Sequence, residues 1–381
     1  MKISSKAQSI PASMTLDITA KVKQLKLEGK SIIGFTAGEP DFNTPEYIIN
    51  SAKHALDIGF TKYTPVAGMP ELRKVICEKF KKDNGLDYTP DQIVVSNGAK
   101  SSLFHAVYAL VEDGDEVIIP SPFWFSYEEQ VKSCGGKPVI VKTKKENGYK
   151  LTASERESAI TDKTVCIMIN SPCNPSGAVY SYDELKAIAE VVEKHNLVVI
   201  SDEIYEKLIY DNQKHVSIAS ISDYMKENTV VINGVSKTYA MTGWRIGYLG
   251  APKKIASTIS RVQGHTASNA TSFAQYATVT AMSTGDDIVE NMRQEFDTRR
   301  KYMMQRFDKM GLTYIKPEGA FYLFVNVSEF YGKSYNGKVI DGSMSFADTL
   351  IDGGVAVIPG LPFHADEFIR LSYAVSMKDI E

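Results

Sequence analysis

The sequence predicts an α/β fold in which helices sandwich a mainly parallel sheet, with a smaller α+β domain beside it. Short β-branched apolar runs alternate with longer amphipathic segments, and this texture changes after about residue 285. At 381 residues the chain also exceeds the usual size of one hydrophobic core. We therefore expect an N-terminal segment at 1–45 that joins the small domain, a large ligand-binding domain at 46–285 and a small C-terminal domain at 286–381.

Short apolar runs predict the strands of the large domain, because each is rich in β-branched residues and ends at turn or polar residues. In chain order they are QIVVSNG, DEVIIPSP, KPVIVKT, TVCIMINSP, LVVISDE and TVVINGVSK. SSLFHAVYALVEDGD and SYDELKAIAEVVEKHN follow a helical pattern, and in the second Ser181 precedes Glu184 at the spacing of a capping box. In the second domain, DDIVENMRQEFDTRRKYMMQRFDKMG predicts a long helix, and AFYLFVNV and GVAVIPG predict strands.

The composition favours a small-molecule partner. A net charge of −3 gives no electrostatic reason to expect nucleic acid or an anionic membrane. No run is apolar enough for a signal peptide or a membrane helix, so we expect a cytoplasmic protein. The four cysteines form no CxxC pair and no cluster with histidine, which argues against a metal site and a disulfide scaffold: Cys77, Cys134, Cys166 and Cys173.

Polar groups follow the predicted strands, at the edge where open α/β sheets bind ligands. They are Gly98, Ala99 and Lys100, then Trp124, Asn174, Asp202, Tyr205, Ser236 and Lys237, with Arg245 soon after. Each alone has an ordinary structural interpretation, such as a solvated lysine, a core tryptophan or a helix-capping aspartate. If the sheet forms as predicted, however, these groups converge, and burial would lower the pKa of Lys237 toward reactivity.

The combination of motifs resembles a known family. AGEPDFNTP, KYTPVAGMPELR, NGAKSSL, NSPCNPSG, SDEIYE, SKTYAMTGWRIGY, KPEGAFYLF and RLSYA occur in this order from about residue 5 to the end. The chain thereby resembles the class I pyridoxal-phosphate-dependent aminotransferases of fold type I, and specifically their bacterial aspartate aminotransferase branch. The motifs are highly specific for the fold and the cofactor, and less specific for the amino acid used.

The resemblance implies a role for each residue around the pyridoxal 5′-phosphate (PLP) ring. Lys237 would form the Schiff base with the cofactor and later move the proton between the substrate Cα and the cofactor carbon. Asp202 would keep the pyridine nitrogen protonated, and Tyr205 and Asn174 would bond the 3-oxygen. Trp124 would stack on the ring. Catalysis would therefore rest on Lys237, Asp202 and Tyr205.

The resemblance also implies a phosphate site and a shared active site. The phosphate would be held by Gly98, Ala99, Lys100, Ser236 and Arg245. Tyr63 matches a tyrosine that reaches the phosphate from the neighbouring subunit, so a homodimer is expected. Because Gly234 stands where classical relatives have a serine, Ser236 would carry more of the phosphate contact.

For the substrate, the resemblance implies that Arg370 pairs with the α-carboxylate, beside Asn174, Trp124 and the backbone of Gly38. A second carboxylate would meet Lys100, Ser13 and Thr15. The expected reaction is aspartate plus 2-oxoglutarate to oxaloacetate plus glutamate. Many relatives carry a lysine in the N-terminal segment that accompanies activity on prephenate. The stretch at 10–13, IPAS, has none, which lowers the expectation of prephenate use.

Other functions stay open at this stage. An aminotransferase for aromatic or other amino acids, or a C–S β-lyase, would keep Lys237, Asp202 and Arg370 but would not need Lys100. A nucleotide-binding enzyme is disfavoured, because no GxGxxG follows a strand and Gln24 stands where a P-loop ending at 29–31 needs its first glycine. The sensor half of a transcriptional regulator would need a DNA-binding domain, for which we expect no room before residue 30.

Overall fold

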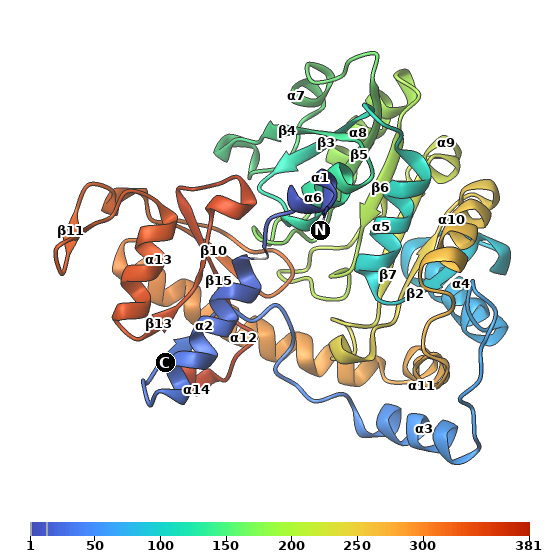
Figure 1. Cartoon of the computed structure of the whole chain (residues 1–381), viewed down its shortest axis with the longest axis horizontal. Helices are drawn as coiled ribbons and strands as arrows, with labels where there is room; N and C mark the ends of the chain where they lie inside the picture. Colours follow the sequence, from blue (N-terminus) through green and yellow to red (C-terminus); the bar gives the residue numbers. More distant parts are fainter. Residues whose placement is uncertain (1, 13) are drawn as a thin grey trace.

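The computed structural model describes residues 2–12 and 14–381, and Figure 1 shows its strands gathered in two parts of the molecule. The larger part holds a seven-stranded sheet and the smaller part a four-stranded one. The long helix α12 (Asp286–Met310) belongs to both, since Val289 packs in the core of the larger part and Phe296 and Met303 in the core of the smaller. The predicted domain boundaries themselves stay a prediction.

The large sheet is mainly parallel, as predicted. Its spatial order is β2 (Ile93–Ser96), β8 (Gly247–Gly250), β7 (Thr229–Gly234), β6 (Val198–Asp202), β5 (Thr164–Asn170), β3 (Glu116–Ser121) and β4 (Lys137–Lys142). All six predicted runs form strands. The unpredicted β8 is antiparallel to both neighbours, and two of its four residues are glycine, which gives little strand signal.

Helices cover both faces of this sheet. Side chains that alternate along a strand point to opposite faces, and here they pack in two different hydrophobic cores. On β3, Val117 packs with α5 (Ala99–Leu110), whereas Ile118 packs with α8 (Tyr182–Lys194). The predicted capping box at Ser181 and Glu184 is present. The helix predicted at 101–115 ends earlier, at Leu110, because Val111 is extended and Gly114, with φ of 91°, turns the chain into β3.

The other helices of the larger part complete its layers (Figure 1). They are α3 (Glu46–Asp57), α4 (Pro70–Asn84), α6 (Ser126–Ser133), α7 (Ala153–Glu157), α9 (Asp223–Glu227), α10 (Lys253–Thr266) and α11 (Ser272–Ser283). Among the described residues, no helix combines the length and apolarity needed to cross a membrane.

The smaller part is built on an antiparallel sheet of β14 (Ile358–Pro359), β15 (Phe368–Ser372), β10 (Tyr322–Asn326) and β9 (Tyr314–Ile315). The strand β1 (Ile33–Gly34) pairs in parallel with β13 (Val355–Ala356), so the N-terminal segment does lie against the C-terminal part. The single strand predicted for GVAVIPG is wrong in one respect. It divides into β13 and β14, which pair in two different sheets.

The remaining elements of the smaller part are short or peripheral. They are α2 (Met14–Leu27), α13 (Ser343–Asp352), α14 (Met377–Ile380), β11 (Ser334–Tyr335) and β12 (Lys338–Val339). The short helix α1 (Ser5–Gln8) instead lies beside α6 of the larger part (Figure 1).

Candidate active site

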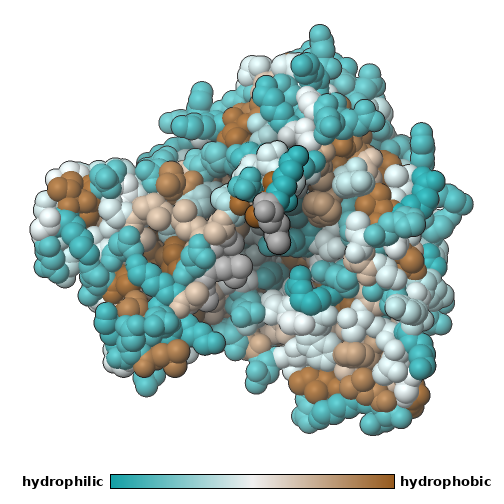
Figure 2. Space-filling view, in the orientation of Figure 1, coloured by the Kyte–Doolittle hydropathy of each residue, from teal (hydrophilic) through white to brown (hydrophobic). Residues whose placement is uncertain are grey.

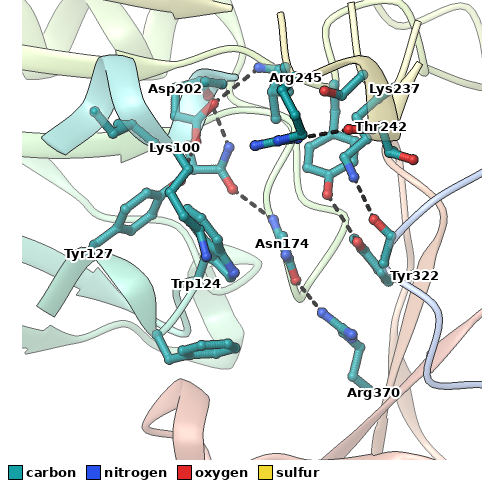
Figure 3. A pocket seen from close by; sticks show the side chains of 18 residues that line it. Lys100, Trp124, Tyr127, Asn174, Asp202, Lys237, Thr242, Arg245, Tyr322 and Arg370 are labelled. Carbon is teal, nitrogen blue, oxygen red and sulfur yellow. Dashed lines mark hydrogen bonds between the residues drawn. The ribbon is translucent and has the colours of Figure 1, made fainter. Parts of the chain in front are cut away.

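A cavity of about 420 Å³ lies where the strands of the large sheet end and the smaller part begins (Figure 3). Its walls come from loops after β3, β5, β6 and β7, from the start of α5, and from β10 and β15. It brings together most of the predicted site residues: Gly38, Ala99, Lys100, Trp124, Asn174, Asp202, Tyr205, Ser236, Lys237, Arg245 and Arg370. The predicted convergence at the strand ends is therefore confirmed.

The antiparallel strand β8 explains how Arg245 reaches this edge. Gly247, at the start of β8, pairs with Ser96 at the end of β2 and with Gly234 at the end of β7. A residue just before β8 therefore lies where its neighbours end. Gly98 has φ of 82°, and a Cβ there would lie 2.3 Å from the Arg245 guanidinium. Only glycine leaves room for this approach.

The start of α5 and Arg245 together form a cradle for an anion. The first backbone N–H groups of a helix have no partner within the helix, and the helix dipole favours negative charge there. A Cβ at Gly247 would lie 2.1 Å from the backbone nitrogen of Ala99, so β8 packs directly against the first turn of α5. Ser236 is buried in the same wall of the cavity.

Asp202, the last residue of β6, is a buried carboxylate that can accept from a cationic donor. The Tyr127 hydroxyl donates to Asp202 Oδ2 at 2.6 Å, and the Ile204 backbone N–H donates to Oδ1 at 3.2 Å. Burial raises the pKa of Asp202 to about 6, against the lowering effect of the Tyr127 hydrogen bond. Because 6 is below neutral pH, the carboxylate is mostly ionised there, and an opposing positive charge would stabilise it.

Lys237 follows β7 and its amine points into the cavity, where it donates a hydrogen bond to the Gly38 carbonyl (Figure 3). The pKa of Lys237 is lowered to about 8, mainly by burial and in part by the nearby guanidinium groups of Arg245 and Arg370. A larger fraction of this amine is neutral at neutral pH than of an exposed lysine. Lys237 can therefore act as a nucleophile and as a base.

Arg370, on β15, is a buried cation prepared for an anionic ligand. Its Nη1 donates to the Asn174 side-chain oxygen at 2.9 Å and its Nη2 to the Thr36 carbonyl at 3.3 Å. Its Nε has no hydrogen-bond partner, and no carboxylate of the described chain forms an ion pair with it. A buried guanidinium without a counter-charge favours a carboxylate ligand, which it can bind through two parallel hydrogen bonds in a bidentate pair.

Lys100 lies on the other side of the cavity, against Trp124 (Figure 3). Its amine is 4.7 Å from the centroid of the Trp124 ring. Burial, together with the charge of Arg245, lowers the pKa of Lys100. Within residues 2–12 and 14–381, no carboxylate forms an ion pair with this amine.

The comparisons with known proteins agree with this geometry. The family model for aminotransferases of class I and II matches residues 30–381. An aspartate aminotransferase of Bacillus subtilis (strain 168) is 45% identical to this chain, over 100% of the chain and 96% of the relative. This chain belongs to the class I and II aminotransferases. A probable aspartate/prephenate aminotransferase of Aquifex aeolicus is 44% identical, over 98% of the chain and 94% of the relative.

Solved aminotransferase structures share the whole fold. The aspartate aminotransferase of Rhizobium meliloti matches with a TM-score of 0.96 at 41% identity, over 100% of this chain and 96% of that one. The Thermus thermophilus aspartate aminotransferase with maleate matches with a TM-score of 0.95 at 37% identity, over 100% of this chain and 97% of that one. The fold type I architecture expected from the sequence is thereby confirmed.

This aminotransferase, like its class, is PLP-dependent. The residues present fit the cofactor: the cradle at Gly98 and Arg245 suits a phosphate, Asp202 suits a protonated ring nitrogen, and Lys237 suits the aldehyde carbon.

Several cavity residues of the aminotransferase were missed by sequence reasoning. They bond to predicted residues rather than to one another: Tyr127 to Asp202, Asn170 to both Asn174 and Asp202, and Tyr322 to Tyr205. Asn170 accepts from the Asn174 backbone N–H at 2.8 Å and donates to the Asp202 carbonyl at 2.9 Å. Their one sequence signal is position: Asn170 and Tyr322 stand in the quoted motifs NSPCNPSG and KPEGAFYLF, and Tyr127 follows Trp124 by three residues.

Four predicted residues are not among the described residues that line the cavity. The Tyr63 side chain is 91% exposed in the single chain. Ser13 lies outside the residues that the structure describes, and so does the side chain of Thr15. Gly98 caps the start of α5 and contributes to the site through the room that it leaves for Arg245.

A buried ionic cluster lies next to the site, beneath the turn after β6. Glu203, Glu206 and His215 have the donor atoms of a metal site within 4.8 Å of one another. The Lys79 amine, however, pairs with Glu206 and the His215 ring with Glu203, and the Asn84 amide donates to both glutamates. The cluster is therefore neutralised within the protein, and it anchors the turn that carries Asp202.

Proposed function

We propose that this aminotransferase transfers the amino group of aspartate to 2-oxoglutarate, giving oxaloacetate and glutamate. One observation carries the choice of a dicarboxylic substrate: besides Lys237 and Arg245, which are assigned to the cofactor, the cavity holds two cations, Arg370 and Lys100, on opposite sides, and neither has a carboxylate partner in the described chain. Two such cations match the two carboxylates of aspartate. The Thermus relative with maleate, itself a dicarboxylate, supports the same proposal.

When bound, PLP supplies an electron sink for the charge left at the substrate Cα. We propose that Asp202 holds the proton on the ring nitrogen and that Tyr205 and Asn174 donate to the 3-oxygen. Trp124 fixes the plane of the ring. The phosphate is held by the cradle: Gly98, Ala99, Lys100, Ser236 and Arg245.

Lys237 is proposed to hold the cofactor and then, once the substrate has displaced it, to take the proton from the substrate Cα. Its lowered pKa of about 8 suits both tasks, because the neutral amine attacks and the neutral amine accepts a proton. Arg370, with Asn174 beside it, fixes the α-carboxylate so that the Cα proton faces this amine.

A homodimer is proposed in which Tyr63 reaches the phosphate of the neighbouring subunit. Tyr63 is 91% exposed in one chain, and Leu56 and Ile58 near it are 48% and 56% exposed. Figure 2 shows apolar residues gathered where α3 lies, at the lower edge of the molecule. The adjoining groove is lined by further apolar residues, among them Phe42, Ile49, Trp244 and Phe273.

Subunit complementation tests this sharing. Tyr63→Ala and Lys237→Ala proteins should each be impaired, and after subunit exchange the mixture should recover about a quarter of wild-type activity, since a mixed dimer has one intact site. A mixture no more active than its components would show that Tyr63 does not act across the interface.

We also propose a cytoplasmic location, which the four unpaired cysteines support.

A half-reaction panel tests the substrate. Each amino acid is mixed with the PLP-loaded protein, and the conversion of the cofactor to its pyridoxamine form is followed by absorbance. Aspartate and glutamate should react far faster than alanine or phenylalanine, and cystathionine should release no pyruvate. Equal rates across the panel would contradict the proposal. The Lys237→Ala protein is the control, and it should lose the visible absorption band together with all turnover.

A further inference from the structure

Tyr322 lies beside Arg370 on one face of the small sheet. It begins β10, and Phe324, two residues on, pairs with Arg370 of β15. Since residues two apart on a strand point to the same face, Tyr322 is a diagonal neighbour of Arg370. The Arg370 guanidinium carbon lies 4.3 Å from the centroid of the Tyr322 ring. At this distance the ring face attracts the cation and limits the orientations that it can adopt.

The other end of the same side chain meets Tyr205. The two hydroxyl oxygens are 2.9 Å apart, and both side chains are buried. Burial raises the pKa of Tyr205 and of Tyr322, so each carries its proton at neutral pH. A neutral hydroxyl has one proton to donate. If Tyr205 directs its proton into the cavity, toward the cofactor, Tyr322 must be the donor of the hydrogen bond between them.

The backbone at 36–38 encloses this arrangement. The Thr36 carbonyl accepts from Arg370, and the Gly38 carbonyl accepts from Lys237. A Cβ at Gly38 would lie 3.7 Å from the Tyr322 hydroxyl, so this backbone packs against it. Figure 3 shows Tyr322 between Lys237 and Arg370. One side chain therefore touches groups assigned to the cofactor and to the substrate.

We propose that Tyr322 is a positioning residue that serves both ends of the reaction centre: its hydroxyl orients Tyr205 toward the cofactor 3-oxygen, and its ring holds the Arg370 guanidinium for the α-carboxylate. This inference rests on the proposed function, because it concerns the roles proposed there for Tyr205 and Arg370. It assigns the two effects to separable parts of one side chain.

The two parts are tested by two substitutions, Tyr322→Phe and Tyr322→Leu. Tyr322→Phe removes only the donor to Tyr205, which then stabilises negative charge on the 3-oxygen less well. The pH midpoint of the visible absorption change of the PLP-loaded protein should rise by about half a unit. The Kd for maleate, a dicarboxylate that cannot react, should stay within about twofold of wild type. Tyr322→Leu should raise the midpoint equally and weaken maleate binding about tenfold.

Tyr373→Phe is the matched control. Tyr373 is a buried tyrosine whose hydroxyl donates to the Ala320 carbonyl at 3.2 Å, and it does not line the cavity. Its loss should change neither the midpoint nor the maleate affinity. An unchanged midpoint in Tyr322→Phe would overturn the inference, as would a shift of the same size in Tyr373→Phe or a loss of maleate affinity common to all three variants.

Tyr205→Phe separates this inference from the proposed function. If Tyr205→Phe raises the midpoint and Tyr322→Phe does not, the role of Tyr322 is wrong and that of Tyr205 stands. If neither substitution raises it, the assignment of Tyr205 to the 3-oxygen is itself wrong.

Discussion

The two sides of the cavity present their cations differently. Arg370 is fixed by the Asn174 amide, the Thr36 carbonyl and the Tyr322 ring, and it is fully buried. Lys100 has one interaction of this kind, with the face of Trp124, and a flexible stem. A rigidly held guanidinium suits the α-carboxylate, which every amino acid carries. A lysine on a flexible side chain suits the side-chain group that distinguishes one amino acid from another. Affinity and selectivity are thus assigned to different regions.

The largest expected effect comes from breaking the rigid side. Arg370→Lys keeps the charge but loses the planar guanidinium group, which can donate hydrogen bonds to Asn174 and to a carboxylate at the same time. Half-reaction rates with aspartate and with alanine should both fall, by roughly 100-fold. The measurement is single-turnover absorbance with each substrate. A loss confined to aspartate would contradict the assignment of Arg370 to the shared carboxylate.

A second prediction concerns Lys237, which lines the same cavity. Because the pKa of Lys237 is lowered from 10.5 to about 8, the fraction of the amine that is neutral should increase about tenfold per pH unit below pH 8 and become constant above it. The rate at which the apo-protein captures PLP should follow this curve. The reaction of PLP with free Nα-acetyl-lysine, in the same buffers, corrects for titration of the cofactor. A corrected rate that keeps rising toward pH 10.5 would show that Lys237 is not perturbed.

The smallest expected effect is on stability. Burial raises the pKa of Asp202 from 3.8 to about 6, so its ionised form destabilises the apo-fold. This penalty is complete above pH 6 and disappears as the pH falls from 6 to 3.8. Asp202→Asn should therefore raise the Tm of the apo-protein at pH 8 by about 2 to 4 °C, with no gain near pH 4.

The same substitution should weaken PLP binding, because the amide cannot hold the proton of the ring nitrogen by charge. Calorimetric Tm values with and without PLP separate the two effects. An Asp202→Asn apo-protein less stable than wild type at pH 8 would contradict the assigned burial penalty.

Much of the site was predictable because local sequence determines it. Six apolar runs, each followed by polar residues, were enough to place Asp202, Asn174 and Lys237 at one edge of a parallel sheet. The role of Arg245 at the phosphate followed only from the family resemblance. Its place depends on β8 running antiparallel between β2 and β7, and a four-residue strand with two glycines carries no signal of its direction.

The residues that support the site were not predictable for a different reason. Tyr127 contacts Asp202 across 75 positions of sequence and Tyr322 contacts Tyr205 across 117, so neither contact leaves a local pattern. The prediction of a single strand for GVAVIPG failed for a similar reason. The pattern of this segment predicts extended chain but cannot show that β13 and β14 pair with different partners.

Arg370 is assigned to the carboxylate that all amino acids share, and Lys100 to the selection of aspartate. The most direct test of this division is the ratio of the half-reaction rates with aspartate and with alanine in the Lys100→Met protein. This variant keeps an apolar stem against Trp124 and removes the charge. We predict that the ratio falls by about 10- to 100-fold, because only aspartate loses a charged partner. In Arg370→Lys the ratio should stay near that of wild type. Equal losses for both substrates in Lys100→Met would contradict the account and leave Lys100 with a role at the cofactor phosphate alone.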